Sequence, residues 1–203
     1  MTMPEQNHLS PEQKKYLLNI VGTVNRYLSN FPNEQEKLDN LRNQLLGETG
    51  NINDRKNYRG HVTASATIVN SKDQVLLIKH NALGLWIPPG GHSDEQEEPI
   101  STALREALEE TGMGTLHIHD WHLQKAIPYD ISTHAIPSNP KKGEEAHSHH
   151  DFRYIFMADD DYQIGLQQKE VSDSQWVSLE EAALLLPRFP WTKAKVIIDK
   201  NAN

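Results

Sequence analysis

Three glutamates, Glu106, Glu109 and Glu110, are spaced so that they could bind a divalent cation together. Side chains three and four residues apart are neighbours on a helix, and like charges at that spacing repel each other. Hard cations such as Mg²⁺ bind carboxylate and phosphate oxygens and would relieve the repulsion. Arg105 lies four residues before Glu109 and can pair with it. The spacing predicts a site that holds metal against a diphosphate; a solvated acidic helix face is the structural alternative.

A helix over residues 99–111 is expected to carry these glutamates. Pro99 suits a first helical turn, where its missing N–H is not needed, and Gly112 suits the left-handed residue after the last turn. Between them, apolar residues follow the i, i+3, i+4, i+7 spacing of a buried stripe: Ile100, Ala103, Leu104, Ala107 and Leu108. A Pro-Pro-Gly-Gly loop, residues 88–91, comes just before the helix. Its glycine backbone can approach a substrate closely because no side chain intervenes.

The stretch from Gly91 to Met113 has the pattern G-x5-E-x7-R-E-A-x-E-E-x-G-M. It resembles the Nudix box at every fixed position, with the small Ala107 where a bulkier apolar residue is usual. The resemblance implies a Nudix-type α/β/α sandwich with a mixed sheet. It also implies an Mg²⁺- or Mn²⁺-dependent enzyme that cleaves nucleoside diphosphates linked to a further group. The metal ligands would be Glu106, Glu109 and Glu110, with Glu97 assisting.

We interpret Glu109, Glu110 and Arg105 as the catalytic residues of this reaction, with Arg105 orienting a glutamate. Gly90 and Gly91 would contact substrate through their backbone. The general base stays open between a glutamate of the box and residues of a later loop: Glu145, His149 and Asp151.

Residues 134–151 read HAIPSNPKKGEEAHSHHD and are interpreted as a long loop that enters a strand. Because strand residues alternate between faces, four polar side chains would share one face: His147, His149, Asp151 and Arg153. They are our substrate-binding candidates. A solvated strand end is an alternative, and a separate transition-metal site of imidazoles is another, since histidine favours Zn, Cu and Ni.

Composition narrows the class of protein. The 203 residues allow one domain plus an extension, and a net charge of −8 argues against nonspecific binding to nucleic acid or anionic membrane. The absence of cysteine excludes disulfides and thiolate chemistry. The first ten residues lack the apolar core of a signal peptide, and the apolar runs are too short to span a bilayer. A cytoplasmic protein with a small-molecule nucleotide substrate is expected.

Alternating helix and strand patterns predict a mixed α/β fold. Residues 1–50 are expected to form a helical hairpin extension, with a capping box at Ser10 and a second cap at Asn33. Its apolar stripes must be covered by its own domain or by a second copy in a homodimer. Residues 58–203 are expected to form the Nudix domain, with strands at 61–69, 75–79, 121–129, 152–158 and 175–177, and helices from 179 and 192.

Two further classes of function compete with catalysis: a catalytically silent nucleotide-binding or regulatory module, and an interaction protein that uses the N-terminal hairpin. Silent members of such families usually lose carboxylates, and this chain keeps all of them. The pattern therefore favours the enzyme. The identity of the substrate depends on loops that one sequence does not decode.

Overall fold

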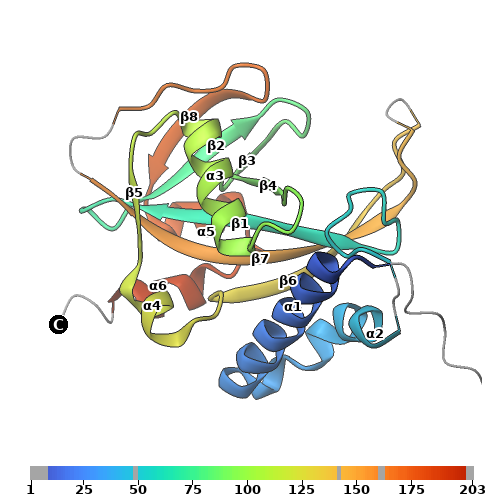
Figure 1. The fold of residues 1–203 in the computed structure, drawn as a ribbon. Coiled ribbons are helices and arrows are strands. Elements are labelled where there is room, and N and C mark those ends of the chain that lie inside the picture. Colours follow the sequence, from blue (N-terminus) through green and yellow to red (C-terminus); the bar gives the residue numbers. More distant parts are fainter. Residues whose placement is uncertain (1–8, 48–49, 141–142, 160–162, 200–203) are drawn as a thin grey trace, which may run out of the picture.

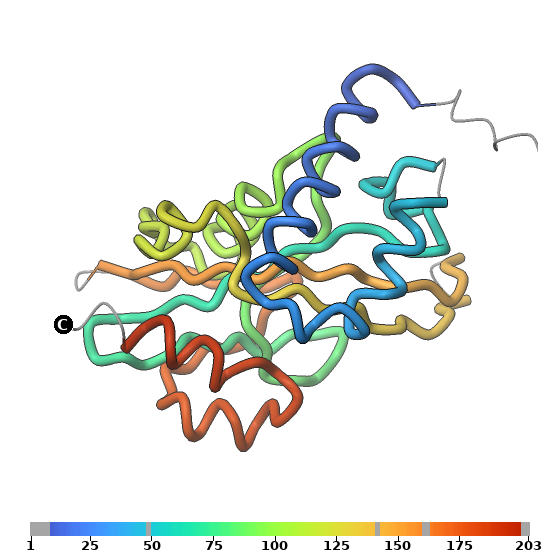
Figure 2. Tube along the Cα trace, turned by 90° about the horizontal axis from the view of Figure 1, so that it is seen from below, coloured from blue at the N-terminus to red at the C-terminus, as the bar shows by residue number. Residues whose placement is uncertain are grey.

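A computed structural model describes residues 9–47, 50–140, 143–159 and 163–199 of the chain. Its centre is a mixed eight-stranded sheet with helices on both sides, as expected (Figure 1). Figure 2 shows the strands between α3 on one side and α5 and α6 on the other. The strands are β1 (His61–Val69), β2 (Val75–His80), β3 (Leu85–Ile87), β4 (Gly90–His92), β5 (Leu116–Ile118), β6 (Asp130–Ile136), β7 (His147–Ala158) and β8 (Val171–Val177). The helices are α1 (Pro11–Asn30), α2 (Asp39–Gly47), α3 (Pro99–Thr111), α4 (Asp120–Lys125), α5 (Leu179–Leu185) and α6 (Trp191–Asp199).

Strand β1 organises the sheet. It pairs in parallel with β7 along its whole length, and antiparallel with β4 at one end and with β2 at the other. Its apolar side chains enter the core beneath α3 and α1: Val62, Ala64, Ala66 and Ile68. In β7, Phe152, Tyr154 and Phe156 join the same core, as strand alternation predicts.

The opposite side is polar where β1 and β7 begin. Further along, Val69 and Ile155 join a second core with α5 and α6. The parallel register pairs His61 with His149, Thr63 with Asp151 and Ser65 with Arg153, so these side chains share one side of the sheet. Strand β4 contributes His92, opposite Thr63, and β6 contributes Ser132 and His134, opposite Asp151 and His149. We call this surface of β1, β4, β6 and β7 the polar face.

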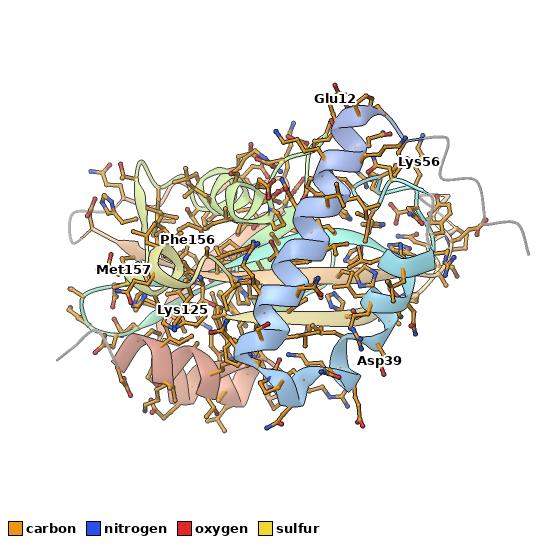
Figure 3. The ribbon with its side chains drawn as sticks, turned by 60° about the horizontal axis from the view of Figure 1, so that its bottom comes forward. Glu12, Asp39, Lys56, Lys125, Phe156 and Met157 are labelled. Atoms are coloured by element: carbon orange, nitrogen blue, oxygen red, sulfur yellow. The ribbon has the colours of Figure 1, made fainter. Side chains whose placement is uncertain are left out.

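Helix α1 crosses the molecule, with Glu12 in its first turn at one end and Asp39, the start of α2, near the other (Figure 3). Ser10 caps α1 in the expected capping box. The helix buries Tyr16, Ile20, Val24 and Tyr27 in the core that also contains the sheet. The extension therefore packs against its own chain.

The second expected cap, at Asn33, is wrong. Pro32–Glu34 and Glu36–Leu38 form short 3₁₀ turns, and the α-helix begins at Asp39. The turns still bury Leu38 completely, so the apolar pattern was correct although the helix type was not.

The strand expected at residues 121–129 is also wrong, because Asp120–Lys125 is a helical turn. The His119 side chain accepts a hydrogen bond from the backbone N–H of Trp121 and caps this turn. A histidine cap is not among the usual capping signals, and Trp121 and Leu123 suggested a strand instead.

The long loop expected over residues 134–151 is largely a hairpin. Strands β6 and β7 pair from Asp130 with Arg153 to Ile136 with His147. Polar residues dominate β6 and the start of β7. Their composition is therefore typical of a loop and does not indicate strand pairing.

The segment between α2 and β1 has turns and no helix or strand in its described residues 50–60, and we call it the linker. It nevertheless buries Ile52 in the core. Within the described ranges, each helix is too short or too polar to cross a lipid bilayer.

His122, in α4, links the helical turn to the sheet. Its Nδ1 donates to the carbonyl oxygen of Ile127 at 2.8 Å, and its Nε2 accepts from the backbone N–H of Ile155 at 2.9 Å. Both bonds require the neutral ring, because a protonated ring has no acceptor. Burial lowers the pKa of His122 to about 4.

We expect this histidine to make the fold sensitive to acid. Its folded pKa lies below its unfolded value, so its contribution is fully present above about pH 6.5 and is lost as pH falls toward about 4. The loss is on the order of 3 kcal/mol. Denaturant titrations at a series of pH values should show a shallower loss of stability for His122→Gln than for the wild type. The exposed His117→Gln should match the wild-type slope; equal slopes in all three proteins would contradict the assignment.

Candidate active site

The glutamates of the box lie on α3. Backbone contacts fix the C-terminal end of this helix and the segment before β8 that packs against it. Gly112 ends α3 in the left-handed conformation, with φ of 66°. A Cβ atom there would lie 2.7 Å from the carbonyl carbon of Gly165. Both the positive φ and this close contact therefore require glycine. Beyond Gly165, the N–H of Gln167 donates to the carbonyl of Glu110 at 3.2 Å. The segment before β8 is thereby held at the C-terminal end of the helix.

Arg105 binds several acceptors of the site at once. Its Nη2 donates to Glu97 Oε2 and to the backbone carbonyl of His92, both at 2.9 Å. Its Nη1 donates to Glu106 Oε1 at 2.8 Å and lies 3.5 Å from Glu109 Oε2. Arg105 was expected to orient Glu109; its shorter contacts are with Glu97 and Glu106.

Glu97 accepts hydrogen bonds from the loop before α3 and from the helix itself: from the Asp94 N–H, Thr102 and Arg105. Burial raises its pKa, but hydrogen bonds from Arg105, Thr102 and the Asp94 N–H outweigh burial and hold the pKa below its usual value. The carboxylate therefore stays charged and keeps Arg105 in place.

Gly91 lies directly against Glu106. A Cβ atom on this glycine would lie 2.5 and 2.6 Å from the two carboxylate oxygens of Glu106. Burial raises the pKa of Glu106, and the charges of Glu109 and Glu170 raise it further against the opposing effect of Arg105. A backbone without a side chain is thus what allows Glu106 to occupy this position.

Glu110 is almost completely buried, and its Oε2 accepts a hydrogen bond from the N–H of Gly90 at 2.9 Å. Burial raises the pKa of Glu110 to about 8. The hydrogen bond from Gly90 acts to lower this pKa, and the charges of Glu106, Glu170 and Glu109 act to raise it. A divalent cation would offset both the burial and the repulsion. The donor set therefore fits a hard cation that binds oxygen.

The three glutamates do not form a closed cluster. Among the described residues, their carboxylate oxygens do not meet within the 4.8 Å that joins the histidine group discussed below. The Glu109 side chain is 51% exposed and extends toward solvent. Binding a cation would draw these carboxylates together.

Glu170 is a site residue that the sequence analysis missed. It immediately precedes β8, and its charge raises the pKa of both Glu106 and Glu110. Its own backbone is held by Asn81 and Gln167. No spacing in the sequence relates it to the box, because the contact depends on the docking of residues 165–170 at the end of α3.

On the polar face, Asp151 and Arg153 bind each other. Arg153 Nε donates to Asp151 Oδ2, and its Nη1 donates to Asp130 Oδ2, each at 2.9 Å. Asp151 also accepts from Ser65 Oγ at 2.8 Å. Asp151 is therefore held by Arg153 and Ser65 within the polar face.

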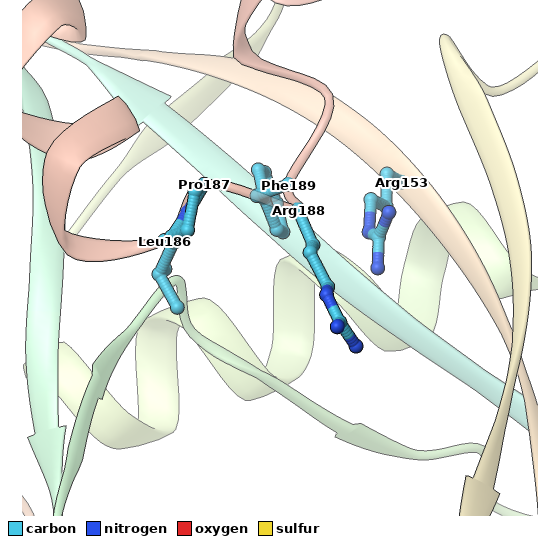
Figure 4. Close-up of a pocket in the computed structure, with 5 residues that line it drawn as sticks. All are labelled: Arg153, Leu186, Pro187, Arg188 and Phe189. Atoms are coloured by element: carbon cyan, nitrogen blue, oxygen red, sulfur yellow. The ribbon is translucent and has the colours of Figure 1, made fainter.

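A shallow pocket lies beside Arg153 and is lined by the turn after α5, residues 186–189 (Figure 4). The guanidinium of Arg153 lies over the ring of Phe189, 4.4 Å from its centre. Figure 4 shows the Arg188 side chain extending from the same turn. The pocket combines cations and an aromatic surface next to the polar face.

The remaining two substrate-binding candidates, His147 and His149, lie at the end of β7 away from Arg153. Burial lowers the pKa of His149 to about 2, helped by the neighbouring His92 and His61. Glu145, a base candidate, offers its backbone carbonyl to His147 Nδ1 at 2.7 Å.

The fold agrees with the comparison to known proteins. A family model of the NUDIX domain matches residues 59–199, and the chain belongs to the Nudix hydrolase family. One relative is the "Probable DHNTP pyrophosphohydrolase" of Lactococcus lactis, 30% identical over 151 residues, which cover 72% of this chain and 80% of that protein.

Other relatives match over shorter stretches. The RNA pyrophosphohydrolase of Brucella anthropi is 32% identical over 51% of this chain and 57% of its own length. The human m7GpppN-mRNA hydrolase NUDT17 is 30% identical over 62% of this chain, which spans only 40% of that protein. Among solved structures, a Caenorhabditis elegans Ap4A hydrolase complex aligns with a TM-score of 0.48 and 20% identity, covering 68% of this chain and 98% of the other.

Replacing Gly91 by alanine should test the contact with Glu106. The added methyl group must displace the Glu106 carboxylate, so we expect hydrolytic turnover to fall about tenfold or more, with little change in melting temperature. Gly114→Ala is the matched control, because a Cβ atom there meets nothing within 4 Å. Steady-state kinetics that give the same kcat/KM for both variants would show that the Gly91 contact has no role.

Proposed function

We propose that this chain is an Mg²⁺- or Mn²⁺-dependent pyrophosphohydrolase that cleaves a nucleoside diphosphate linked to another moiety. The observation that carries the proposal is the combined position of Gly90, Gly91 and α3. These glycines bring an open backbone against Glu106 and Glu110, while Arg105 fixes Glu97 and Glu106. This arrangement offers carboxylate oxygens to a cation beside a backbone that a diphosphate can reach.

The metal would be held by Glu106, Glu109 and Glu110, with Glu97 supporting the site through Arg105. When bound, the cation neutralises phosphate charge and acidifies a water molecule. Arg105 keeps the Glu106 carboxylate in a fixed orientation, and the Gly90 N–H does the same for Glu110. Half-exposed Glu109 is free to turn toward an incoming ligand.

The general base stays open between the glutamates of the box, Glu145, His149 and, as a further candidate, Glu170. We rank Glu170 above Asp151, because Asp151 is bound to Arg153. Glu109 is the most exposed glutamate of the box, so its carboxylate can contact water directly.

The substrate's other moiety would lie along the polar face toward Arg153 and the pocket of residues 186–189. A planar ring can pack on Phe189, and Arg188 can meet a phosphate. The relative from Lactococcus lactis makes dihydroneopterin triphosphate a first compound to test. The Brucella relative, an RNA pyrophosphohydrolase, adds an RNA that carries a phosphoric anhydride.

A panel of substrates tests the proposal directly. Release of phosphate or pyrophosphate would be measured with Mg²⁺ and with Mn²⁺ for dihydroneopterin triphosphate, triphosphorylated RNA, a nucleotide sugar and a dinucleoside polyphosphate. We expect at least one compound to be cleaved in a metal-dependent way. Tight nucleotide binding without cleavage would favour the catalytically silent module instead.

We expect Glu109→Gln and Glu110→Gln each to reduce metal-dependent turnover by roughly a hundredfold or more, since each removes a metal ligand or a base. The fold should persist, because neutral glutamine keeps the size of the side chain. Glu36→Gln, on the exposed surface, is the matched control. Wild-type kcat in either site variant would refute these assignments.

Glu170→Gln should lower turnover by about tenfold or more, because its charge acts on Glu106 and Glu110. Asp151→Asn tests the carboxylate that was expected from the sequence. The decisive measurement is the dependence of rate on Mn²⁺ concentration, which should shift to higher concentration for Glu170→Gln. An unshifted curve would remove Glu170 from the site.

A further inference from the structure

Three histidines from distant parts of the sequence meet at one end of the polar face. His61 begins β1, while His147 and His149 lie at the start of β7. One ring nitrogen from each lies within 4.8 Å of the other two. The Nε2 atoms of His147 and His149 are 3.2 Å apart.

The buried Nε2 of His61 has no hydrogen-bond partner among the described residues, and His61 is only 1% exposed. A buried polar atom without a partner normally costs free energy, so it calls for an explanation such as an ion. The other nitrogen of the same ring, Nδ1, lies 3.4 Å from the Asn57 carbonyl and donates to it. The neutral ring therefore presents the lone pair of Nε2 to the cluster.

His147 is oriented in the same way. Its Nδ1 donates to the Glu145 carbonyl at 2.7 Å, which leaves the lone pair on Nε2. Metal-binding histidines usually donate their second N–H to a carbonyl or carboxylate in this manner. Two of the three rings thus have both the tautomer and the outer partner of a metal ligand.

The spacing also fits a transition-metal ion. Ligands at the usual Zn–N distance are about 3.4 Å apart in a tetrahedral site, close to the 3.2 Å between His147 and His149. No two of the three nitrogens are more than 4.8 Å apart, so each gap would need to close by at most about 1.4 Å, which side-chain rotation can supply. Imidazole nitrogen favours Zn²⁺ and related ions over Mg²⁺.

We propose that His61, His147 and His149 form a second metal site that binds Zn²⁺ or a similar transition-metal ion, separate from the carboxylates of α3. The ion would connect the start of β1 to the start of β7, where the two strands pair as His61 with His149. It would also fix the end of the linker through the Asn57 carbonyl.

This site adjoins the hydrolytic one without sharing its ligands. The ring of His92 lies 5.0 Å from that of His61 and 4.9 Å from that of His149, centre to centre. The backbone carbonyl of His92 accepts from Arg105 at 2.9 Å. An ion in the histidine cluster would therefore stabilise the strand that carries the Arg105 contact.

The test measures binding of Zn²⁺ and Co²⁺ to the full chain after chelator treatment, by competition with a chromogenic chelator and by visible absorption of Co²⁺. We expect one Zn²⁺ per chain and the intense absorption of tetrahedral Co²⁺ with nitrogen ligands, in both the wild type and Glu109→Gln. Loss of an outer partner alone costs about 10–100-fold in affinity, so His147→Gln and His149→Gln should lose more than about a hundredfold. His117→Gln, on an exposed side chain, should bind as the wild type does.

Thermal unfolding separates loss of the site from loss of the fold. Zn²⁺ should raise the melting temperature of the wild type and of His117→Gln, because it binds the folded state, and it should leave that of folded His147→Gln unchanged. Equal Zn²⁺ affinity in the wild type and His147→Gln would overturn the proposal. So would binding abolished by Glu109→Gln, which would place the ion at the carboxylates. Cleavage of the substrate panel is a separate readout, so failure of either proposal leaves the other measurable.

Discussion

Repulsion between carboxylates on one side of α3 is the constraint on which the candidate active site depends. Each buried carboxylate has a specific partner: Arg105 for Glu106 and a backbone N–H for Glu110. Partners of this kind reduce the cost of burial without removing it, as the raised pKa of Glu110 shows. A cation bound here, as proposed, would offset the repulsion that Arg105 and the backbone leave uncompensated.

Strand β1 connects this site to the rest of the molecule. Its pairing with β4 sets the position of Gly90 and Gly91 under α3, and its pairing with β7 builds the polar face. The side of β1 toward α3 is apolar and fully buried, which fixes the register, since a shift of one residue would exchange the two sides. The carboxylate site and the histidine cluster consequently keep a defined relation although they share no ligand.

Local signals accounted for much of this architecture. The helix of the box follows from Pro99, Gly112 and the apolar stripe between them, and the alternation along β7 follows from its period of two. Contacts between distant segments could not be predicted from the sequence. Glu170 approaches the carboxylates only because residues 165–170 dock on α3, and His61 meets His149 only through parallel pairing across the whole intervening chain. The helical turn of α4 also depends on a distant contact, since His122 accepts a hydrogen bond from the backbone N–H of Ile155 in β7.

The N-terminal extension belongs to the same structural unit as the site. Lys193 of α6 donates to Glu34 at 2.6 Å and to the Tyr27 hydroxyl at 2.7 Å. Its ammonium also lies 3.5 Å from the centre of the Phe31 ring.

Tyr27 and Lys37 both contact Asp130, the same carboxylate that holds Arg153 on the polar face. A charged network therefore runs from the extension to Arg153, which lines the pocket of residues 186–189. Buried charges of this kind are costly when one partner is lost, so removal of the extension would leave Asp130 and Lys193 short of partners and disturb the position of Arg153.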